Sequence, residues 1–451
     1  MRASLLRRLV GLTAASPRRW LCGTTTPSSP SNRTDVEPLR ILFCGSDAFS
    51  CASLGALHAE MQRQDGLPKD HRASLAGRIA SLDVVVRPAK RTGRGLKQVA
   101  DSPVRTMATE LGLCVHERDT FTGWQPPSVN MIIAVSFGLF VPPRILGAAR
   151  YGGLNVHPSL LPDLPGAAPI EHAILSGRER TGVTVQTLDD KAFDEGHILL
   201  QGPKAEAEEG AFGLAIPPSC TADELHRLLA PLGADLLIQA LRRGLYLPGA
   251  VAASAAAKIL PPGFVPVLAS KLSKADQQVP WRLHQHSQSA TATAEDIDRR
   301  ARALGPLWTH LAVPQGRQSP MPTQKRAILG DIELVTCPDQ MAPLLQRQAA
   351  ESSRAETKDS PCAFQTATFV QRDGQHQTAV ALPFTVSPDG SESIILPAGI
   401  SSRASDSSSC IRIGTIKIEG DRAKPAARAI AGFSHNETTL GQVAWYVVFR
   451  Q

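Results

Sequence analysis

An asparagine and a histidine stand two positions apart in the segment 154–162, and an aspartate follows in a separate Phe-Asp-Glu-Gly segment. Alternate residues of an extended segment point to one face, so Asn155 and His157 are predicted to lie side by side. Pro158 favours an extended conformation at the residue before it. The fold must then bring Asp194 to them. An amide, an imidazole and a carboxylate together suit transfer of a group through a tetrahedral intermediate.

Continuous apolar segments at 40–46, 82–86 and 129–135 are predicted to be the strands that position these residues. Their apolar residues do not alternate with polar ones, which indicates a parallel sheet covered on both faces by helices. Helices are expected from about Phe49 and over residues 102–112. The first domain is therefore predicted to be α/β with a mostly parallel sheet.

A second domain is predicted beyond residue 270. Thr221 to Glu224 form a capping-box pattern that opens the last helix of the first domain. Residues 247–270 are rich in Ala, Pro and Gly and are predicted to be a linker. A helix at 296–304 and several short β-like segments follow, which suit a small β-barrel. These segments are 332–336, 379–383, 394–396, 411–418 and 445–449.

Three polar segments interrupt the second domain and are predicted to be mobile insertions. Residues 314–328 are rich in Pro, Gln and Arg, whereas residues 346–361 and 399–409 are rich in Ser and charged side chains. Segments of this composition bury too little apolar surface to build a core.

The amino terminus has the composition of a mitochondrial transit peptide. The first 34 residues contain six arginines and no acidic residue, and Ser, Thr, Leu and Ala fill the gaps. A basic amphipathic helix can form over residues 1–20. We therefore expect residues 1–36 to be a targeting segment and the protein to reach the mitochondrial matrix.

Composition limits the other classes of protein. The net charge of +7 permits an anionic partner without requiring one. The eight cysteines are scattered and include no Cys-x-x-Cys pair, so neither a zinc site nor a disulfide framework is predicted. Scattered cysteines suit a reducing compartment. No apolar segment reaches the roughly 18 residues that a membrane span needs.

The segment around Asn155 resembles the folate-dependent formyltransferases, and most closely the methionyl-tRNA formyltransferases of mitochondrial type. That family carries Asn-x-His, then Pro-Ser-Leu-Leu-Pro and a later Asp-x-Gly, as this chain does at 155–162 and 194–196. The resemblance implies a Rossmann-like formyltransferase domain at 37–246. It also implies an OB-like, tRNA-binding β-barrel domain at 271–451.

The resemblance gives three residues catalytic roles. Asn155 and His157 would donate hydrogen bonds to the formyl oxygen, while Asp194 would orient His157 and take a proton from the amine. The cosubstrate is expected to be 10-formyltetrahydrofolate, and no metal is expected. The residues expected to line its site are Val135, Ser136, Phe137, Gly138, Ser159, Leu160, Leu161 and Pro162.

Pro165 is the main departure from the family pattern, which has arginine at this position. The replacement removes a cation and a hydrogen-bond donor, and it fixes the backbone angle φ. Because the Asn, His and Asp residues all remain, an active enzyme is still expected.

A basic segment suggests what accepts the formyl group. Residues 87–97 contain five basic residues, no acidic one and two glycines. Loops of this composition contact phosphates, and this one resembles the loop with which the family meets the tRNA acceptor stem. The candidate tRNA-binding residues are Arg87, Lys90, Arg91, Arg94 and Lys97.

The expected reaction is therefore formylation of initiator methionyl-tRNA for mitochondrial translation, by a monomer. Other users of 10-formyltetrahydrofolate stay open, namely glycinamide ribonucleotide and sugar-nucleotide formyltransferases and a hydrolase or dehydrogenase. A protein of another class, an RNA-binding relative impaired at Pro165, also stays open.

Overall fold

The computed structural model describes residues 36–66, 77–92, 95, 98–203, 212–254, 265–279, 281, 293–312, 324–339, 341, 364–373, 376–397, 409–437 and 447–449. Residues 1–35 of the predicted targeting segment lie outside the described residues. All elements below belong to the compact unit Pro38–Gln451. Among the described residues, no helix has both the length and the apolar character needed to cross a bilayer.

A seven-stranded sheet forms the centre of the first domain, in the order β10-β9-β7-β6-β1-β2-β5. The five strands from β7 to β5 in this order are parallel, whereas β9 runs antiparallel to both β7 and β10. The predicted mostly parallel α/β sheet is confirmed. The strands are β1 (Leu39–Gly45), β2 (Ile79–Val86), β5 (Cys114–Glu117), β6 (Met131–Val135), β7 (Gly153–His157), β9 (Val183–Thr187) and β10 (Ile198–Gly202).

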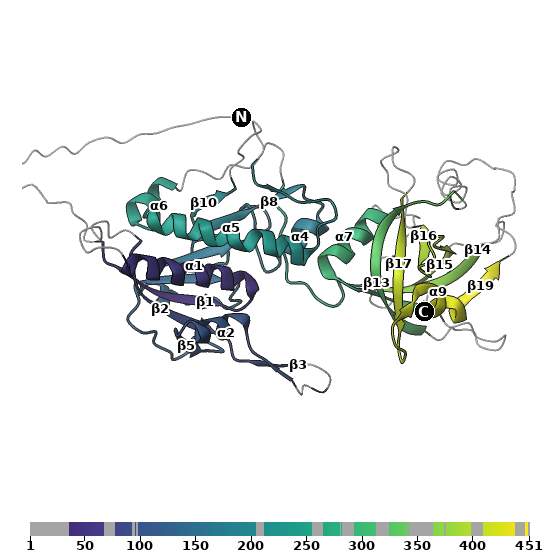
Figure 1. Ribbon diagram of the computed structural model, residues 1–451, viewed down its shortest axis with the longest axis horizontal. Helices are drawn as coiled ribbons and strands as arrows, with labels where there is room; N and C mark the ends of the chain where they lie inside the picture. Colours follow the sequence, from purple (N-terminus) through teal and green to yellow (C-terminus); the bar gives the residue numbers. More distant parts are fainter. Residues whose placement is uncertain are drawn as a thin grey trace, which may run out of the picture. The chain divides into compact units, whose positions relative to one another are not determined.

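Helices and loops cover both faces of this sheet, which explains its continuous apolar strands. In β1, Ile41 and Phe43 belong to one hydrophobic cluster, and Leu42 and Cys44 belong to the other. Two long helices, α1 and α5, run side by side over the first cluster (Figure 1). The helices are α1 (Ala48–Asp65), α2 (Pro103–Glu110), α3 (Pro143–Leu146), α4 (Pro169–Leu175), α5 (Ala222–Arg242) and α6 (Pro248–Ser254).

The predicted cap of α5 is present. The Thr221 side chain accepts a hydrogen bond from the Glu224 N–H, and the Glu224 carboxylate accepts one from the Thr221 N–H at 2.9 Å. Such a cap stabilises a helix by about 1 kcal/mol. Helix α2 likewise begins after the capping residue Ser102, and Gly112 follows its end with φ of 68°. A positive φ suits glycine because it has no side chain.

A buried carboxylate joins α1 to α5. The Glu60 side chain is only 3% exposed and accepts hydrogen bonds from Arg63, Arg242 and Gln64. Burial by itself disfavours the charged carboxylate, but the hydrogen bonds from these donors outweigh it and lower the pKa of Glu60 to about 2. The interaction therefore stabilises the packing of the two helices while Glu60 is ionised.

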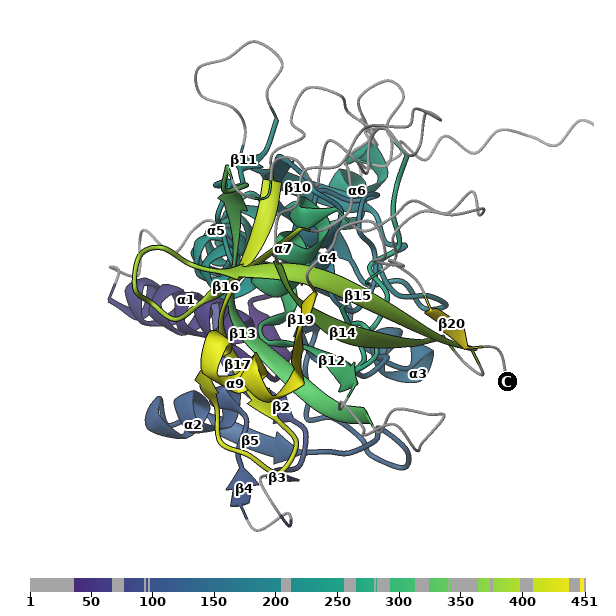
Figure 2. The ribbon, with the colours of Figure 1, turned by 90° about the vertical axis from the view of Figure 1, so that its right-hand side faces the viewer.

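The second domain is an antiparallel sheet that closes on itself. The pairings run β12–β13–β17–β16–β15–β14 and return from β14 to β12, which makes a closed barrel (Figure 2). The strands are β12 (Leu307–Ala312), β13 (Gln324–Thr336), β14 (Phe364–Asp373), β15 (His376–Val386), β16 (Ile394–Pro397) and β17 (Ser409–Ile418). Short strands β18 (Lys424–Pro425), β19 (Ser434–Glu437) and β20 (Val447–Phe449) extend it.

Aromatic packing fills one side of this barrel's core. Trp281 packs on Phe369 with ring centroids 4.5 Å apart, and its indole N–H donates to Thr309 at 2.8 Å. Helix α7 (Ala294–Leu304) begins after a capping residue, Thr293, and includes the predicted helix at 296–304. The predicted small β domain with one preceding helix is confirmed.

The prediction of mobile insertions is partly wrong. Residues 324–328 begin the long strand β13, and residue 409 begins β17. Arg326 is exposed and the next residue, Ala327, is buried, as expected for alternating side chains in a strand with one solvated side. Residues 314–323, 346–361 and 399–408 lie outside the described residues.

We predict that Glu60→Gln lowers the free energy of unfolding at neutral pH by about 2 kcal/mol, because two arginines lose a charged acceptor. The folded-state pKa lies below the ordinary value of 4.5, so this stabilisation is complete above pH 4.5. It decreases as the pH falls toward about 2. Chemical denaturation of the wild type and the variant across this range measures the difference.

Glu110→Gln, at an exposed position of α2, is the control and should change the unfolding free energy little at any pH. A difference between the wild type and Glu60→Gln that did not depend on pH would contradict this account of Glu60.

Candidate active site

The structure brings the three predicted catalytic residues together. Asn155 and His157 lie on β7, where they pair with Gln186 and Thr184 of the antiparallel neighbour β9. Asp194 lies in the loop that follows β9, and its Oδ1 atom is 3.3 Å from His157 Nδ1. The side chains of His157 and Asp194 are only 6% and 9% exposed, so this contact is shielded from water.

Three nitrogen atoms surround the Asp194 carboxylate. His157 Nδ1 and Gln186 Nε2 approach Oδ1 at 3.3 and 3.2 Å, and the Gly166 backbone N–H donates to Oδ2 at 2.8 Å. Asp194 itself has φ of 59°, a left-handed conformation that aspartate tolerates better than most residues. Because both oxygens are held, the carboxylate has a fixed orientation toward the imidazole.

A glycine allows the Asp194 loop to approach β9. A Cβ atom added to Gly196 would lie 1.7 Å from the Thr187 carbonyl oxygen, which is far inside van der Waals contact. This close approach gives a structural reason for glycine in the Asp-x-Gly pattern.

His157 is held at both ring nitrogens. Its Nε2 atom lies 2.9 Å from the Leu164 carbonyl oxygen, on the side of the ring opposite to Asp194. Both nitrogens thus face acceptor oxygens. A neutral imidazole satisfies one of these contacts and an imidazolium satisfies both.

Asn155 has a hydrogen-bond donor left for a ligand. One N–H of its amide donates to the Ala134 carbonyl oxygen at 3.1 Å, and its Oδ1 atom accepts from Gln186 Nε2 at 3.3 Å. These contacts fix the orientation of the amide. An asparagine amide has two N–H groups, and among the described residues the second has no acceptor, so it is available to a ligand beside His157.

Gln186 belongs to the site, although the sequence did not single it out. The residue is 1% exposed, and its Nε2 atom reaches both Asn155 and Asp194. Its Oε1 atom is buried without a hydrogen-bond partner among the described residues. Its position across from Asn155 depends on the register of β7 and β9, which no local pattern reveals.

Backbone pairing accommodates Pro165 where the family pattern has arginine. Its carbonyl oxygen accepts from the Ala269 N–H at 2.8 Å, and the Ala167 N–H donates to the Ala269 carbonyl at 2.7 Å. This short parallel bridge centres on Gly166 and Ala269 and uses no N–H from residue 165. Segment 265–270, within the predicted linker, therefore supports the loop that holds Asp194.

The residues expected to bind folate occupy two loops beside the catalytic residues. Val135, at the end of β6, is fully buried, and Phe137 is 4% exposed in the second hydrophobic cluster. Ser136 and Gly138 are exposed and have φ of 46° and 72°. The backbone between them is thus accessible, whereas the side chains of Val135 and Phe137 serve the core.

The second expected folate segment makes internal contacts. Ser159 Oγ donates to the Asp163 carbonyl oxygen at 2.6 Å, and the Leu161 N–H donates to Thr184 Oγ1 at 3.0 Å. Leu161 is also buried, whereas Leu160 and Pro162 are half-buried. A folate-binding role for these four residues stays a prediction.

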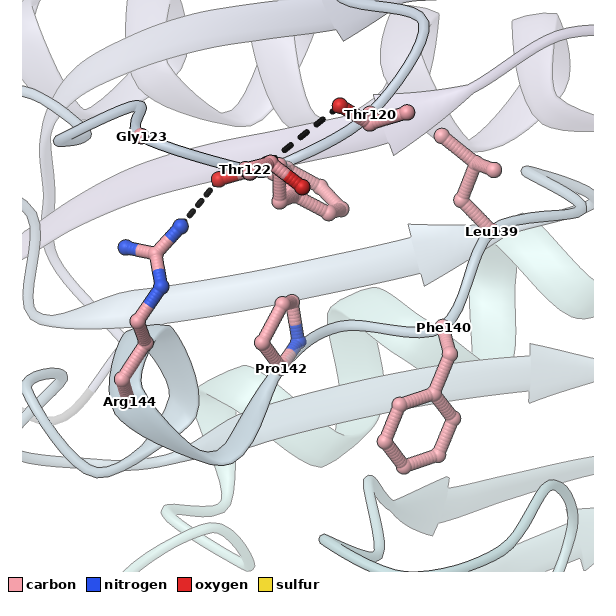
Figure 3. Close-up of a pocket in the computed structure, with 8 residues that line it drawn as sticks. Thr120, Thr122, Gly123, Leu139, Phe140, Pro142 and Arg144 are labelled. Carbon is pink, nitrogen blue, oxygen red and sulfur yellow. Dashed lines mark hydrogen bonds between the residues drawn. The ribbon is translucent and has the colours of Figure 1, made fainter.

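A pocket of about 400 Å³ lies next to the loop that continues from Gly138. Figure 3 shows Leu139 and Phe140 on one side of it and Arg144 on the other. The guanidinium group of Arg144 donates to the backbone carbonyl groups of Phe121 and Trp124. None of the three predicted catalytic residues lines this pocket.

The predicted tRNA-binding segment forms a β-hairpin of β3 (Lys90–Thr92) and β4 (Gln98–Ala100). Arg91 is exposed on it, and Arg87 pairs with Asp119 at 2.8 Å just before it. Arg94 and Lys97, at the turn, lie outside the described residues, as does the side chain of Lys90. The hairpin contains no acidic residue that would neutralise its basic side chains.

Known proteins resemble the chain in the same regions. A family model described as Formyl transferase matches residues 40–208, which include the whole site. A methionyl-tRNA formyltransferase from Chromohalobacter salexigens is 32% identical over 283 residues, which cover 61% of this chain and 73% of that protein. The mitochondrial methionyl-tRNA formyltransferase of Saccharomyces cerevisiae is 32% identical over 306 residues, which cover 60% of this chain and 69% of that protein.

Fold and sequence thus define a formyl transferase. The chain belongs, more specifically, to the family of methionyl-tRNA formyltransferases, as the sequence resemblance predicted. Among solved structures, an N-formyltransferase from Helicobacter canadensis, in complex with folinic acid and dTDP-3-aminofucose, aligns with a TM-score of 0.41 at 12% identity. The alignment covers 83% of this chain and 98% of that one.

Proposed function

We propose that this protein transfers the formyl group of 10-formyltetrahydrofolate to the amino group of methionyl-tRNA. The observation that carries the proposal is the contact of His157 with Asp194 beside the free N–H of Asn155, in a chain of this family. The products are N-formylmethionyl-tRNA and tetrahydrofolate.

The three side chains divide the chemistry between them. The amine nitrogen attacks the formyl carbon, and negative charge develops on the formyl oxygen. The second N–H of Asn155 donates to that oxygen, and such donors contribute roughly 3–4 kcal/mol to transition-state stabilisation. Asp194 accepts the proton that the attacking nitrogen loses. The bond from the formyl carbon to the folate nitrogen then breaks.

His157 provides the proton for the departing folate nitrogen. Its Nδ1 side is held by Asp194, and its Nε2 side rests on the Leu164 carbonyl oxygen. When the folate substrate displaces the Leu164 carbonyl oxygen from His157 Nε2, this nitrogen is already oriented to donate its proton to the folate nitrogen.

The two substrates are proposed to meet the protein at separate places. The loop 135–138 and the segment 159–162 form the folate wall, with the exposed backbone at Ser136 and Gly138 as donors and acceptors. The β3–β4 hairpin, with Arg91 exposed, contacts the phosphates of the tRNA acceptor stem. Residues 37–246 form the catalytic domain, and the barrel at 271–451 holds the tRNA.

We further propose that the protein carries out this reaction in mitochondria. The arginine-rich, acid-free composition of residues 1–34 supports it. The similarity to the mitochondrial protein of Saccharomyces cerevisiae also supports it. The product would then serve initiation of translation in that organelle.

Formyl transfer by the purified protein tests the reaction, with 10-formyltetrahydrofolate and charged methionyl-tRNA as substrates. We expect Asn155→Ala, His157→Ala and Asp194→Asn each to lower turnover by more than about a hundredfold, since each removes a group that acts in the transition state. Glu110→Gln, on α2 away from the site, should leave turnover unchanged.

Two outcomes would contradict the proposal. Equal release of tetrahydrofolate with and without tRNA would indicate a hydrolase. Wild-type turnover in a folded Asp194→Asn variant would remove this residue from the reaction.

A reporter fused to residues 1–36 tests the proposed location. We expect the reporter to enter mitochondria, because the mitochondrial import machinery recognises positively charged amphipathic segments. Replacing Arg2, Arg7, Arg8, Arg18 and Arg19 by glutamine should keep it in the cytosol. Import that did not depend on these arginines would contradict the targeting role.

A further inference from the structure

Three possible metal ligands meet on one face of the first sheet, away from the proposed catalytic residues. Asp83 of β2 pairs with Cys114 of the edge strand β5, and His116 follows Cys114 by two positions on the same face. One oxygen of Asp83, the Cys114 sulfur and one nitrogen of His116 all lie within 4.8 Å of one another. The remaining residues of this face are mostly apolar.

The distances approach those of a tetrahedral site. Cys114 Sγ lies 3.7 Å from His116 Nε2. Zinc–sulfur and zinc–nitrogen bonds of about 2.3 and 2.05 Å at a tetrahedral angle place the two ligand atoms about 3.6 Å apart. Asp83 and His116 are half-buried and Cys114 is exposed, so small side-chain rotations can bring the three ligand atoms to bonding distance of one ion.

The same residues are less suited to nucleophilic catalysis. A cysteine activated by histidine needs a third group that orients the ring. Among the described residues, no carboxylate forms an ion pair with His116, although an Asp83 oxygen lies within 4.8 Å of one of its ring nitrogens. The His116 ring instead packs beside Trp124, with ring centroids 5.6 Å apart, so its orientation is set by packing.

The charges also suit a divalent cation. A Cys114 thiolate and an Asp83 carboxylate together balance two positive charges, and a neutral His116 adds a third ligand. Sulfur, nitrogen and oxygen donors in one set favour a borderline-soft ion of the zinc class over magnesium or calcium. The exposed side at Cys114 leaves the fourth position to water.

We propose that Asp83, Cys114 and His116 bind a zinc-class divalent cation. The ion joins the edge strand β5 to β2 and stabilises that edge of the sheet. It takes no part in formyl transfer, so this proposal is independent of the proposed function. No local spacing in the sequence reveals this set, because Asp83 lies on β2 whereas Cys114 and His116 lie on β5.

Cobalt titration of the purified, reduced and metal-stripped full chain tests the site. We expect one equivalent of Co²⁺ to produce a thiolate-to-cobalt charge-transfer band and tetrahedral d–d bands, both abolished by added Zn²⁺. Cys114→Ser should remove the charge-transfer band. His116→Gln and Asp83→Asn should each weaken Co²⁺ binding by more than about tenfold.

Cys51→Ser is the matched control, because this thiol lies on α1 outside the cluster, and it should leave the spectrum unchanged. Thermal unfolding provides a second readout, in which Zn²⁺ should raise the Tm of the wild type and not that of Cys114→Ser. Three results would overturn the proposal: no charge-transfer band, a band that survives Cys114→Ser, or unchanged affinity in both His116→Gln and Asp83→Asn.

Discussion

The orientation of one carboxylate is the constraint on which the rest of the candidate site depends. Asp194 is held by a side chain of β7, a side chain of β9 and a backbone N–H of the loop after β7. Each of these donors depends on a different part of the fold. The sheet register places His157 and Gln186, and the bridge between Gly166 and Ala269 places the loop. An error in any of them would turn the carboxylate away from the imidazole.

This constraint explains the glycines near the site. Gly166 has φ of 122°, and a Cβ atom there would lie 2.4 Å from the Ala269 carbonyl oxygen. Gly196 allows the Asp194 loop to touch β9. Both positions let backbone approach backbone closely, as glycine allows. Asp194 is therefore fixed mainly by main-chain packing, while side-chain hydrogen bonds complete its orientation.

The parts of the site that sequence could predict are the local ones. The spacing of Asn155 and His157 is enough to place them on one face, because a strand alternates. The pairing with Asp194 came from resemblance to a family. Gln186 was not predictable, because a glutamine in a strand gives no sign of which residue lies opposite. The support for Pro165 comes from Ala269, which is distant in the sequence and lies in a segment predicted to be only a linker.

The same distinction holds for the fold. The buried parallel strands and the capped helices were predicted because local composition is sufficient there. In the second domain, β12 and β14 were not predicted, although they complete the closed ring of strands. Their residues mix polar and apolar types, since one side of each barrel strand faces outward. Closure of a barrel is a property of the pairing of distant strands.

The turnover number for formyl transfer in a double-mutant cycle of Gln186→Met and Asp194→Asn tests most directly whether Gln186 acts by holding Asp194. Methionine retains the volume of glutamine and removes the hydrogen-bond donor. We predict that Gln186→Met alone lowers kcat by about tenfold with little change in KM, equivalent to about 1.4 kcal/mol. In the Asp194→Asn background it should lower kcat no further. Independent, additive losses would contradict the account, as would a wild-type kcat for Gln186→Met.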